Sequence, residues 1–206
     1  MSETDRPQIT LITPPAFVLE DFVPCLVNVL DAHDIACLRL SMASRDEDVI
    51  ARAADSLREL CHARDVAIVV DDHVLLAQRL GLDGVHLTNT RKNIRKLRVD
   101  MGPDAIIGAY CGQTRHDGIS AAEAGADYVC FGPIGQTPLG DGATAPHDLF
   151  QWWSDMIEVP VIAEGALTAD LITQFAPVTD FFGIGPEIWK DDDAKAALGA
   201  LLAPLG

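Results

Sequence analysis

Short runs of apolar residues alternate along this chain with longer segments in which apolar residues recur every three or four positions. The runs suit strands buried on both faces, and the longer segments suit amphipathic helices. Strands are expected at residues 9–13, 35–40, 66–70, 84–87, 106–110, 128–131, 159–163 and 181–184. Helices are expected at residues 17–32, 47–63, 74–80, 93–101, 118–124, 148–156, 169–175 and 194–202. Pro24 should kink or break the first helix, and Asp46 should cap the second.

The order of these elements predicts the fold. Eight strand–helix units in 206 residues indicate an α/β protein that forms a (β/α)8 TIM barrel, with residues 1–206 in a single domain. An open, doubly wound sheet is the alternative, but it would normally have fewer strands and one clear switch point. There is no GxGxxG after the first strand and no P-loop motif anywhere, so dinucleotide-binding and P-loop sites are disfavoured.

Composition narrows the class of protein. The chain is 49% apolar and 22% charged, which is typical of a globular protein, and no apolar run reaches the roughly 18 residues of a membrane span. Its net charge of −16 argues against general binding to nucleic acid or to an anionic membrane. The polar, acidic N-terminus shows no secretory signal. Five cysteines without CxxC spacing are interpreted as reduced thiols of a cytoplasmic protein, which makes a cysteine-based metal site unfavourable.

One basic cluster stands out against this acidic background. Five of the 15 basic side chains fall within eight residues: Arg91, Lys92, Arg95, Lys96 and Arg98. Two interpretations remain open. The cluster is either a solvated helix face or the start of a helix that faces a phosphate.

The segment from Ala124 to Leu139 holds the strongest local signal. A four-residue apolar run, 128–131, leads into the loop Gly132-Pro133-Ile134-Gly135-Gln136-Thr137-Pro138, which helix geometry would not tolerate. Backbone N–H groups in such a loop, with the hydroxyl of Thr137, can hold an anion. The alternative is an ordinary loop without a ligand.

In a barrel, ligand chemistry lies at the carboxyl ends of the strands. Polar residues and glycines in or directly after the expected strands are therefore the candidates for a site. They are Arg39, Ser41, Asp71, Asp72, Thr88 to Arg91, Tyr110, Thr137, Glu164, Gly165 and Gly185.

Four segments together resemble a known family. VVDDHVLLAQRLGLDGVHL, IIGAYC, EAGADYVCFGPIGQTP and VPVIAEGAL occur in the order and spacing of thiamine phosphate synthase and its relative, thiazole tautomerase. The similarity covers nearly the whole chain. It implies a TIM barrel that joins an aminopyrimidine diphosphate to a thiazole phosphate, with Mg²⁺ helping pyrophosphate to leave. The implied ligand is thus a small phosphorylated heterocycle, and a homo-oligomer stays open.

The resemblance also implies roles for individual residues. Catalytic roles fall to Arg39, Asp72 and Thr137, and Asp72 is in addition the implied Mg²⁺ ligand. The implied substrate-binding residues are Asp71, His86, Arg91, Tyr110, Gln136, Gly165 and Gly185. Simpler interpretations stand beside these: Arg39 pairs with Asp72 across the barrel, Asp71 and Asp72 cap a helix, and His86 is a hydrogen-bonded structural histidine.

Several family positions have changed in this chain. The strand-two lysine is Ser41, the lysine of the Thr-Pro-Thr-Lys motif is Gly140, and the second Mg²⁺-binding acid is Arg91. We therefore expect Arg91 to hold a phosphorylated ligand with little dependence on Mg²⁺. The alternative is that Arg91 points to solvent or pairs with Asp71 or Asp72. Glu164 should repel an anion. Pro133 replaces the histidine of thiazole tautomerases, which disfavours that activity.

Three hypotheses follow from these departures. The chain is a thiamine phosphate synthase with a degenerate anion clamp, an isomerase or lyase acting on a related heterocycle, or a catalytically reduced barrel that binds such a ligand.

Overall fold

The structure is a computed structural model that describes residues 6–89, 93–137 and 142–206. Eight parallel strands form a closed barrel in the order β1 to β8, with β8 paired to β1. The strands are β1 (Gln8–Ile12), β2 (Cys37–Leu40), β3 (Ala67–Asp71), β4 (Gly84–Leu87), β5 (Ile106–Tyr110), β6 (Tyr128–Phe131), β7 (Val161–Glu164) and β8 (Phe181–Ile184). The expected (β/α)8 barrel is confirmed, and the open sheet is not formed.

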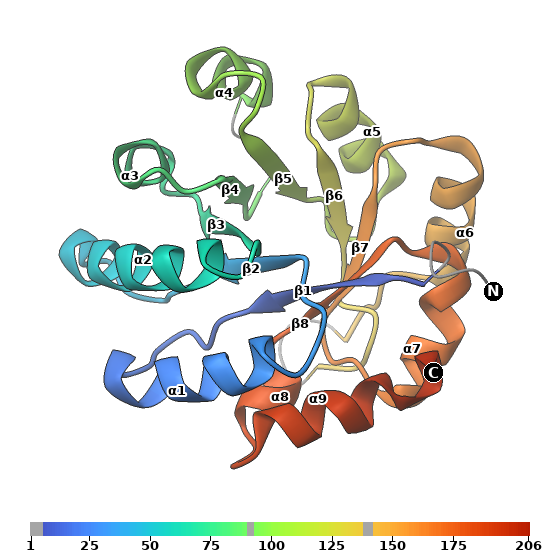
Figure 1. The fold of residues 1–206 in the computed structure, drawn as a ribbon. Coiled ribbons are helices and arrows are strands. Elements are labelled where there is room, and N and C mark those ends of the chain that lie inside the picture. Colours follow the sequence, from blue (N-terminus) through green and yellow to red (C-terminus); the bar gives the residue numbers. More distant parts are fainter. Residues whose placement is uncertain (1–5, 90–92, 138–141) are drawn as a thin grey trace.

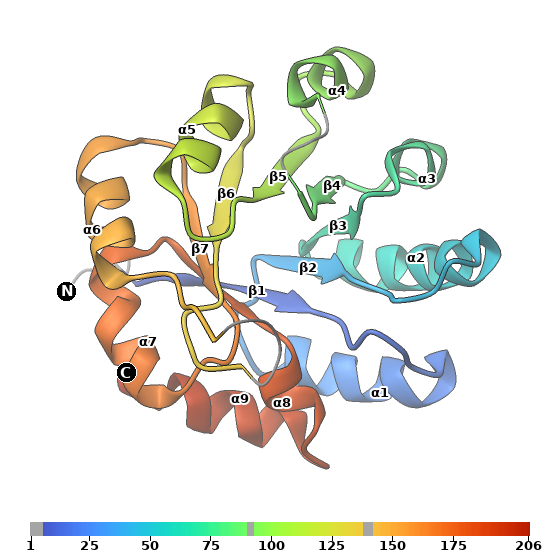
Figure 2. The same cartoon turned by 180° about the vertical axis from the view of Figure 1, so that it is seen from behind.

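Helices surround the strands on the outside (Figures 1 and 2). They are α1 (Leu19–Leu30), α2 (Glu47–His62), α3 (Val74–Leu80), α4 (Ile94–Met101), α5 (Arg115–Glu123), α6 (His147–Met156), α7 (Ala169–Phe175), α8 (Pro186–Trp189) and α9 (Ala194–Leu202), with 3-10 turns at Ala176–Val178 and Ala203–Leu205. In the described part of the chain, no helix is long and apolar enough to cross a membrane.

Side chains alternate between the two faces of each strand. Leu38 and Leu40 of β2 are fully buried in the apolar layer under the helices. Arg39 lies between them in sequence and faces the barrel interior, where it meets side chains of β3 and β7. The carboxyl ends of the strands, here called the mouth of the barrel, therefore carry polar side chains on the inner face.

Aspartates connect three pairs of neighbouring strands by hydrogen bonds at the opposite end of the barrel. Each lies just before an even-numbered strand, and its Oδ2 accepts the backbone N–H of a residue at the start of the preceding odd-numbered strand. The pairs are Asp83 with Ile68 at 2.7 Å, Asp127 with Ile107 at 2.6 Å, and Asp180 with Val161 at 2.8 Å.

The helix boundaries differ from the expectations at a few positions. Asp46 caps α2 as expected, since its side chain accepts from two backbone N–H groups. Pro24 does not break α1, which continues through it to Leu30. Helix α5 begins at Arg115, three residues before the expected Gly118, because the Thr114 side chain caps it. Helix α8 was not expected, and it is only four residues long.

Candidate active site

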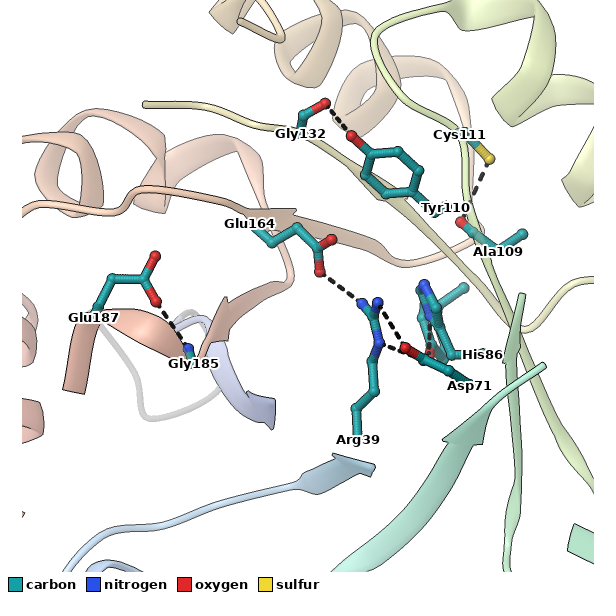
Figure 3. Close-up of polar contacts among 11 residues, drawn as sticks. Arg39, Asp71, His86, Ala109, Tyr110, Cys111, Gly132, Glu164, Gly185 and Glu187 are labelled. Carbon is teal, nitrogen blue, oxygen red and sulfur yellow. Dashed lines mark hydrogen bonds and ion pairs between the residues drawn. The ribbon is translucent and has the colours of Figure 1, made fainter. Parts of the chain in front are cut away.

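An ion-pair cluster lies inside the mouth of the barrel. The Nε atom of Arg39 donates to Asp71 over 2.7 Å, and its Nη1 donates to Glu164 over 2.9 Å (Figure 3). The three side chains are 10%, 14% and 15% exposed. Burial alone would lower the pKa of Arg39, but the attraction of Glu164 and Asp71 outweighs burial and raises it. Arg39 is therefore a permanent cation whose charge is already balanced within the fold.

The cluster corrects one expectation from the sequence. Arg39 pairs with Asp71 and Glu164, whereas Asp72 was the expected partner. The reason is the alternation of side chains along β3. Asp71 is two residues beyond Val69, which lies opposite Arg39 in the ladder, so Asp71 shares the inner face with Arg39.

Asp72 follows β3 in a left-handed backbone conformation, with φ of 58°. Its backbone N–H donates to the carbonyl of His86 over 3.0 Å, and its carboxylate accepts from the hydroxyl of Thr88. The expected capping by the pair Asp71 and Asp72 is wrong, because His73 is the N-cap of α3 and no side-chain bond is made there. Asp72 instead joins the ends of β3 and β4.

His86 is 1% exposed in β4, and its Nδ1 lies 2.9 Å from the phenol oxygen of Tyr128. The two rings stack at 5.7 Å. Burial, assisted by Arg39, holds the pKa of His86 well below its usual range, while burial raises that of Tyr128. Sequence reasoning missed Tyr128. Its signal is Gly108 on the neighbouring strand, where a Cβ would lie 1.9 Å from the tyrosine ring.

The loop after β6 is hydrogen-bonded to neighbouring segments of the mouth. The Tyr110 hydroxyl donates to the Gly132 carbonyl over 2.6 Å, and burial, with a smaller effect of Glu164, raises the pKa of Tyr110 to about 12. Two backbone bonds of this loop, from Ile134 to Glu164 and from Gly135 to Gly165, measure 3.0 and 2.9 Å. The loop is thus held by β5 on one side and β7 on the other.

Two predicted residues of this loop directly follow Gly135. Gln136 is exposed and Thr137 is partly buried. Both belong to the connection that follows β6 at the mouth, and their contact with a ligand stays a prediction. The side chain of Tyr110 reaches Gly132 at the start of the same connection.

The ends of β7 and β8 are joined by a residue that sequence reasoning also missed. Glu187 accepts the backbone N–H of Gly185 over 2.8 Å and that of Leu167 over 3.0 Å (Figure 3 shows the bond to Gly185). Gly165 has φ of 92°, which favours glycine, and a Cβ there would lie 2.7 Å from Pro133. The predicted glycines Gly165 and Gly185 are therefore positions of close backbone approach.

Arg91 and Lys92 lie outside the described residues, so the structure does not place this part of the basic cluster. Arg98, in contrast, lies within the described residues, and its contacts show a structural role. Its guanidinium donates to the carbonyls of Gly102, Pro103, Ala105 and Gly125 and pairs with Asp127. Arg98 therefore fastens the end of α4 to the strand connections around it.

The carboxylates at the mouth can be compared with the ligands that Mg²⁺ requires. Among residues 6–89, 93–137 and 142–206, no group of three or more His, Cys, Asp and Glu side chains is arranged to hold a metal ion. Both Asp71 oxygens are bonded to Arg39, at 2.7 and 3.4 Å, so Asp71 does not suit a metal ion, and Asp72 remains the predicted ligand. One carboxylate together with substrate phosphates and water is a usual Mg²⁺ environment.

Comparisons with known proteins agree with this architecture. The family described as thiamine monophosphate synthase matches residues 9–179. The thiamine-phosphate synthase of Rhodospirillum centenum is 39% identical over 194 residues, which cover 92% of this chain and 93% of that protein. That of Erythrobacter litoralis is 33% identical, with 95% of each chain covered.

A solved structure agrees at the level of the fold. Thiamine phosphate pyrophosphorylase from Pyrococcus furiosus superposes with a TM-score of 0.82 at 20% identity, covering 98% of this chain and 96% of that one. The family match and the two relatives together span the barrel and every strand end described above. The chain belongs to the thiamine monophosphate synthase family.

Proposed function

We propose that this protein joins an aminopyrimidine diphosphate to a thiazole phosphate at the mouth of its barrel and releases pyrophosphate. The observation that carries the proposal is the match to thiamine-phosphate synthases over 92% and 95% of the chain at 39% and 33% identity. In this reaction the bond between a carbon and the diphosphate oxygen breaks, and a bond from that carbon to the thiazole forms.

The main physical demand is to stabilise the negative charge of the departing pyrophosphate. Arg39 supplies orientation more than net charge, since Asp71 and Glu164 already balance it. Tyr110 positions the loop that carries Gln136 and Thr137, and the Thr137 hydroxyl is a donor for a phosphate oxygen. Mg²⁺, held by Asp72 together with the substrate phosphates, would neutralise diphosphate charge when bound.

The alternatives are less well supported. An isomerase or lyase, or a barrel without catalysis, would not be expected to match synthases over so much of the chain. Thiazole tautomerase chemistry is disfavoured by Pro133, which stands where the resemblance calls for a histidine. Five free thiols support a cytoplasmic location.

The test is synthesis by the purified protein. Both substrates are supplied with and without Mg²⁺, and thiamine phosphate and pyrophosphate are measured by chromatography. We expect both products in equal amounts, with turnover about 10²–10³-fold below that of a synthase with a complete clamp, because charge-stabilising donors are missing.

Asp72→Asn is the informative variant, and it should lose the Mg²⁺-dependent part of the rate. Asp46→Asn, at the cap of α2, removes the same charge while keeping a capping side chain, and should behave as wild type. Folded wild-type protein that forms neither product under any condition would refute the proposal.

A further inference from the structure

Tyr128 reaches across the barrel interior to His86. The two residues lie on β6 and β4, and each is paired in register with Gly108 of the strand between them, β5. Because Gly108 has no side chain, the tyrosine lies over it, where a Cβ would be 1.9 Å from the ring and 2.3 Å from the hydroxyl oxygen. The hydroxyl lies 2.9 Å from Nδ1 of His86, and the two rings stack. Tyr128 therefore fixes the imidazole from two strands away.

The hydrogen of this bond belongs to the phenol. Both rings are neutral, since burial holds the pKa of His86 well below its usual range and raises the pKa of Tyr128. Within the described residues, the Tyr128 hydroxyl makes this one hydrogen bond. If Nδ1 carried the proton of the imidazole, the phenol hydrogen and the lone pair of Nε2 would both lack a partner. If the phenol donates to Nδ1, only the N–H group at Nε2 lacks one.

The Nε2 atom of His86 is a buried polar atom without a partner in the described part of the chain, and the residue is 1% exposed. Buried polar groups in proteins are nearly always paired, so this exception calls for a partner from outside the chain. His86 is aligned with Asp71 in the ladder of β3 and β4 and lies beside the ion-pair cluster inside the mouth (Figure 3). A group bound in the mouth can supply the missing acceptor.

The charges around His86 favour an uncharged acceptor. Asp71 and Glu164 are partly exposed, and together they already balance Arg39. An anionic group at Nε2 would meet these two carboxylates, whereas a neutral ring nitrogen would not be repelled by them. An aminopyrimidine has two such ring nitrogens, each with a lone pair in the plane of the ring.

We propose that Tyr128 is a positioning residue for substrate binding: it donates to Nδ1 of His86 and so keeps the imidazole proton on Nε2, which donates to a ring nitrogen of the aminopyrimidine. Tyr128 does not touch the substrate in this arrangement and acts through the histidine. The identity of the pyrimidine rests on the proposed function, whereas the direction of the hydrogen bond rests on the geometry alone.

The tautomer is measured by 15N NMR of protein labelled at its histidines, at about pH 8, where exposed histidines are neutral as well. The signals of His86 are those that His86→Asn removes. In wild type, His86 should carry its proton on Nε2. In Tyr128→Phe, which keeps the ring and loses the donor, both tautomers should appear, because no contact selects between them.

The acceptor is tested by calorimetry with the aminopyrimidine diphosphate and Mg²⁺, with the thiazole left out so that no turnover occurs. The comparison ligand is the aniline analogue, in which C–H groups replace both ring nitrogens while the amino group and the diphosphate stay. Wild type should bind the analogue about tenfold more weakly, and only the pyrimidine should shift the Nε2 proton of His86 downfield. In Tyr128→Phe the difference between the two ligands should shrink to about threefold or less.

The matched control is Thr179→Val, which also removes a buried hydroxyl. Thr179 lies two residues before the start of β8, at the opposite end of the barrel, and its hydroxyl donates to the carbonyl of Val161 over 3.0 Å. This variant should keep the wild-type tautomer of His86 and the wild-type preference for the pyrimidine.

Three results would overturn the inference: His86 of wild type carries its proton on Nδ1, wild type shows no preference for the pyrimidine, or Tyr128→Phe retains the tautomer or the full preference of wild type. An internal water as the only partner of Nε2 would give the second result. The proposed function fails in a different way, when the ligands bind as described and the synthesis assay gives no product. Two of the three results are read from wild type, so a poorly folded Tyr128→Phe leaves the test intact.

Discussion

The Nη1 atom of Arg39 in β2 donates to Oε2 of Glu164 in β7 over 2.9 Å, although these strands are not neighbours in the barrel. The same guanidinium holds Asp71 of β3 through its Nε. One buried cation thus spans the interior and joins three strands. The carboxylate that was expected to repel an anion is engaged in keeping this cation in place.

Removing that cation should destabilise the protein. In Arg39→Met, Asp71 and Glu164 lose their partner while remaining mostly buried, at 14% and 15% exposure. We expect the free energy of unfolding to fall by about 3–5 kcal/mol, as for other broken buried pairs. Urea unfolding followed by circular dichroism measures this.

A surface pair provides the control for this variant. Arg58→Met breaks an ion pair with Asp55 whose side chains are 27% and 54% exposed, and it should change stability by less than about 1 kcal/mol. The double variant Arg39→Met/Glu164→Gln should recover part of the loss, since one uncompensated charge is gone. A loss in Arg39→Met no larger than in Arg58→Met would contradict the role of the cluster.

His86 should make stability depend on pH. Its pKa in the folded protein is well below 6.5, so below that pH the unfolded chain binds a proton that the folded protein does not. Stability should therefore decrease as the pH falls below about 6.5, with a contribution of about 1.4 kcal/mol per pH unit. The measurement is the free energy of unfolding of wild type and His86→Asn between pH 7 and pH 5.

The comparison uses the slope of the free energy of unfolding against pH. The absolute stabilities are not compared, because His86→Asn also removes the contact with Tyr128. The variant should show the shallower slope. His116→Asn, at an exposed position of α5, is the control and should keep the slope of wild type. Parallel curves for His86→Asn and wild type would argue against a buried neutral histidine.

Tyr110→Phe tests the loop after β6. The change removes the hydroxyl that donates to Gly132 over 2.6 Å and leaves the ring. Since this bond positions the loop that carries Thr137, we expect kcat/KM to fall about 10- to 100-fold with little change in thermal stability. With its pKa near 12, Tyr110 stays protonated, so the loss should be equal at pH 7 and pH 9. A loss that varies between these two pH values would indicate a role in proton transfer.

Two helical glycines should respond in opposite ways to alanine. In Gly118→Ala the new Cβ would lie 2.6 Å from the ring of Trp153 and 2.7 Å from that of Phe131, both fully buried. We expect a loss of about 1–3 kcal/mol from overpacking. In Gly199→Ala the nearest atom is 3.6 Å away, so the better helix propensity of alanine should raise stability by about 1 kcal/mol. Thermal melts that move in the same direction for both variants would contradict this packing.

The strands could be predicted because each is a short apolar run buried on both faces, and nearly every expected boundary lies within two residues of the observed one. Helix starts were less certain. The sequence suggested a helix start at Gly118, whereas the constraint on this glycine is its contact with Trp153, a residue distant in sequence. The polar candidates of the mouth were found for the same reason as the strands, since they directly follow them.

The partners within the site could not be predicted in the same way. The pairing of Arg39 with Glu164 joins residues 125 positions apart and depends on the closure and inner face of the barrel. Glu187 lies in a four-residue helix that has no periodic signal, and it accepts from backbone N–H groups, which every residue type except proline offers. The role of Arg91 remains a prediction.

The three aspartates at the amino-terminal end of the barrel bear on the order in which it assembles. Each of Asp83, Asp127 and Asp180 binds a backbone group only 15 to 20 residues earlier in the chain. Contacts between such near positions form with a small loss of chain entropy, whereas the ladder that joins Gln8 to Phe181 must enclose the whole barrel. We therefore expect folding to begin as two-strand modules and to end with closure of β8 on β1. In pulsed hydrogen exchange, the amides of Ile68, Ile107 and Val161 should then become protected before those of the β1–β8 seam.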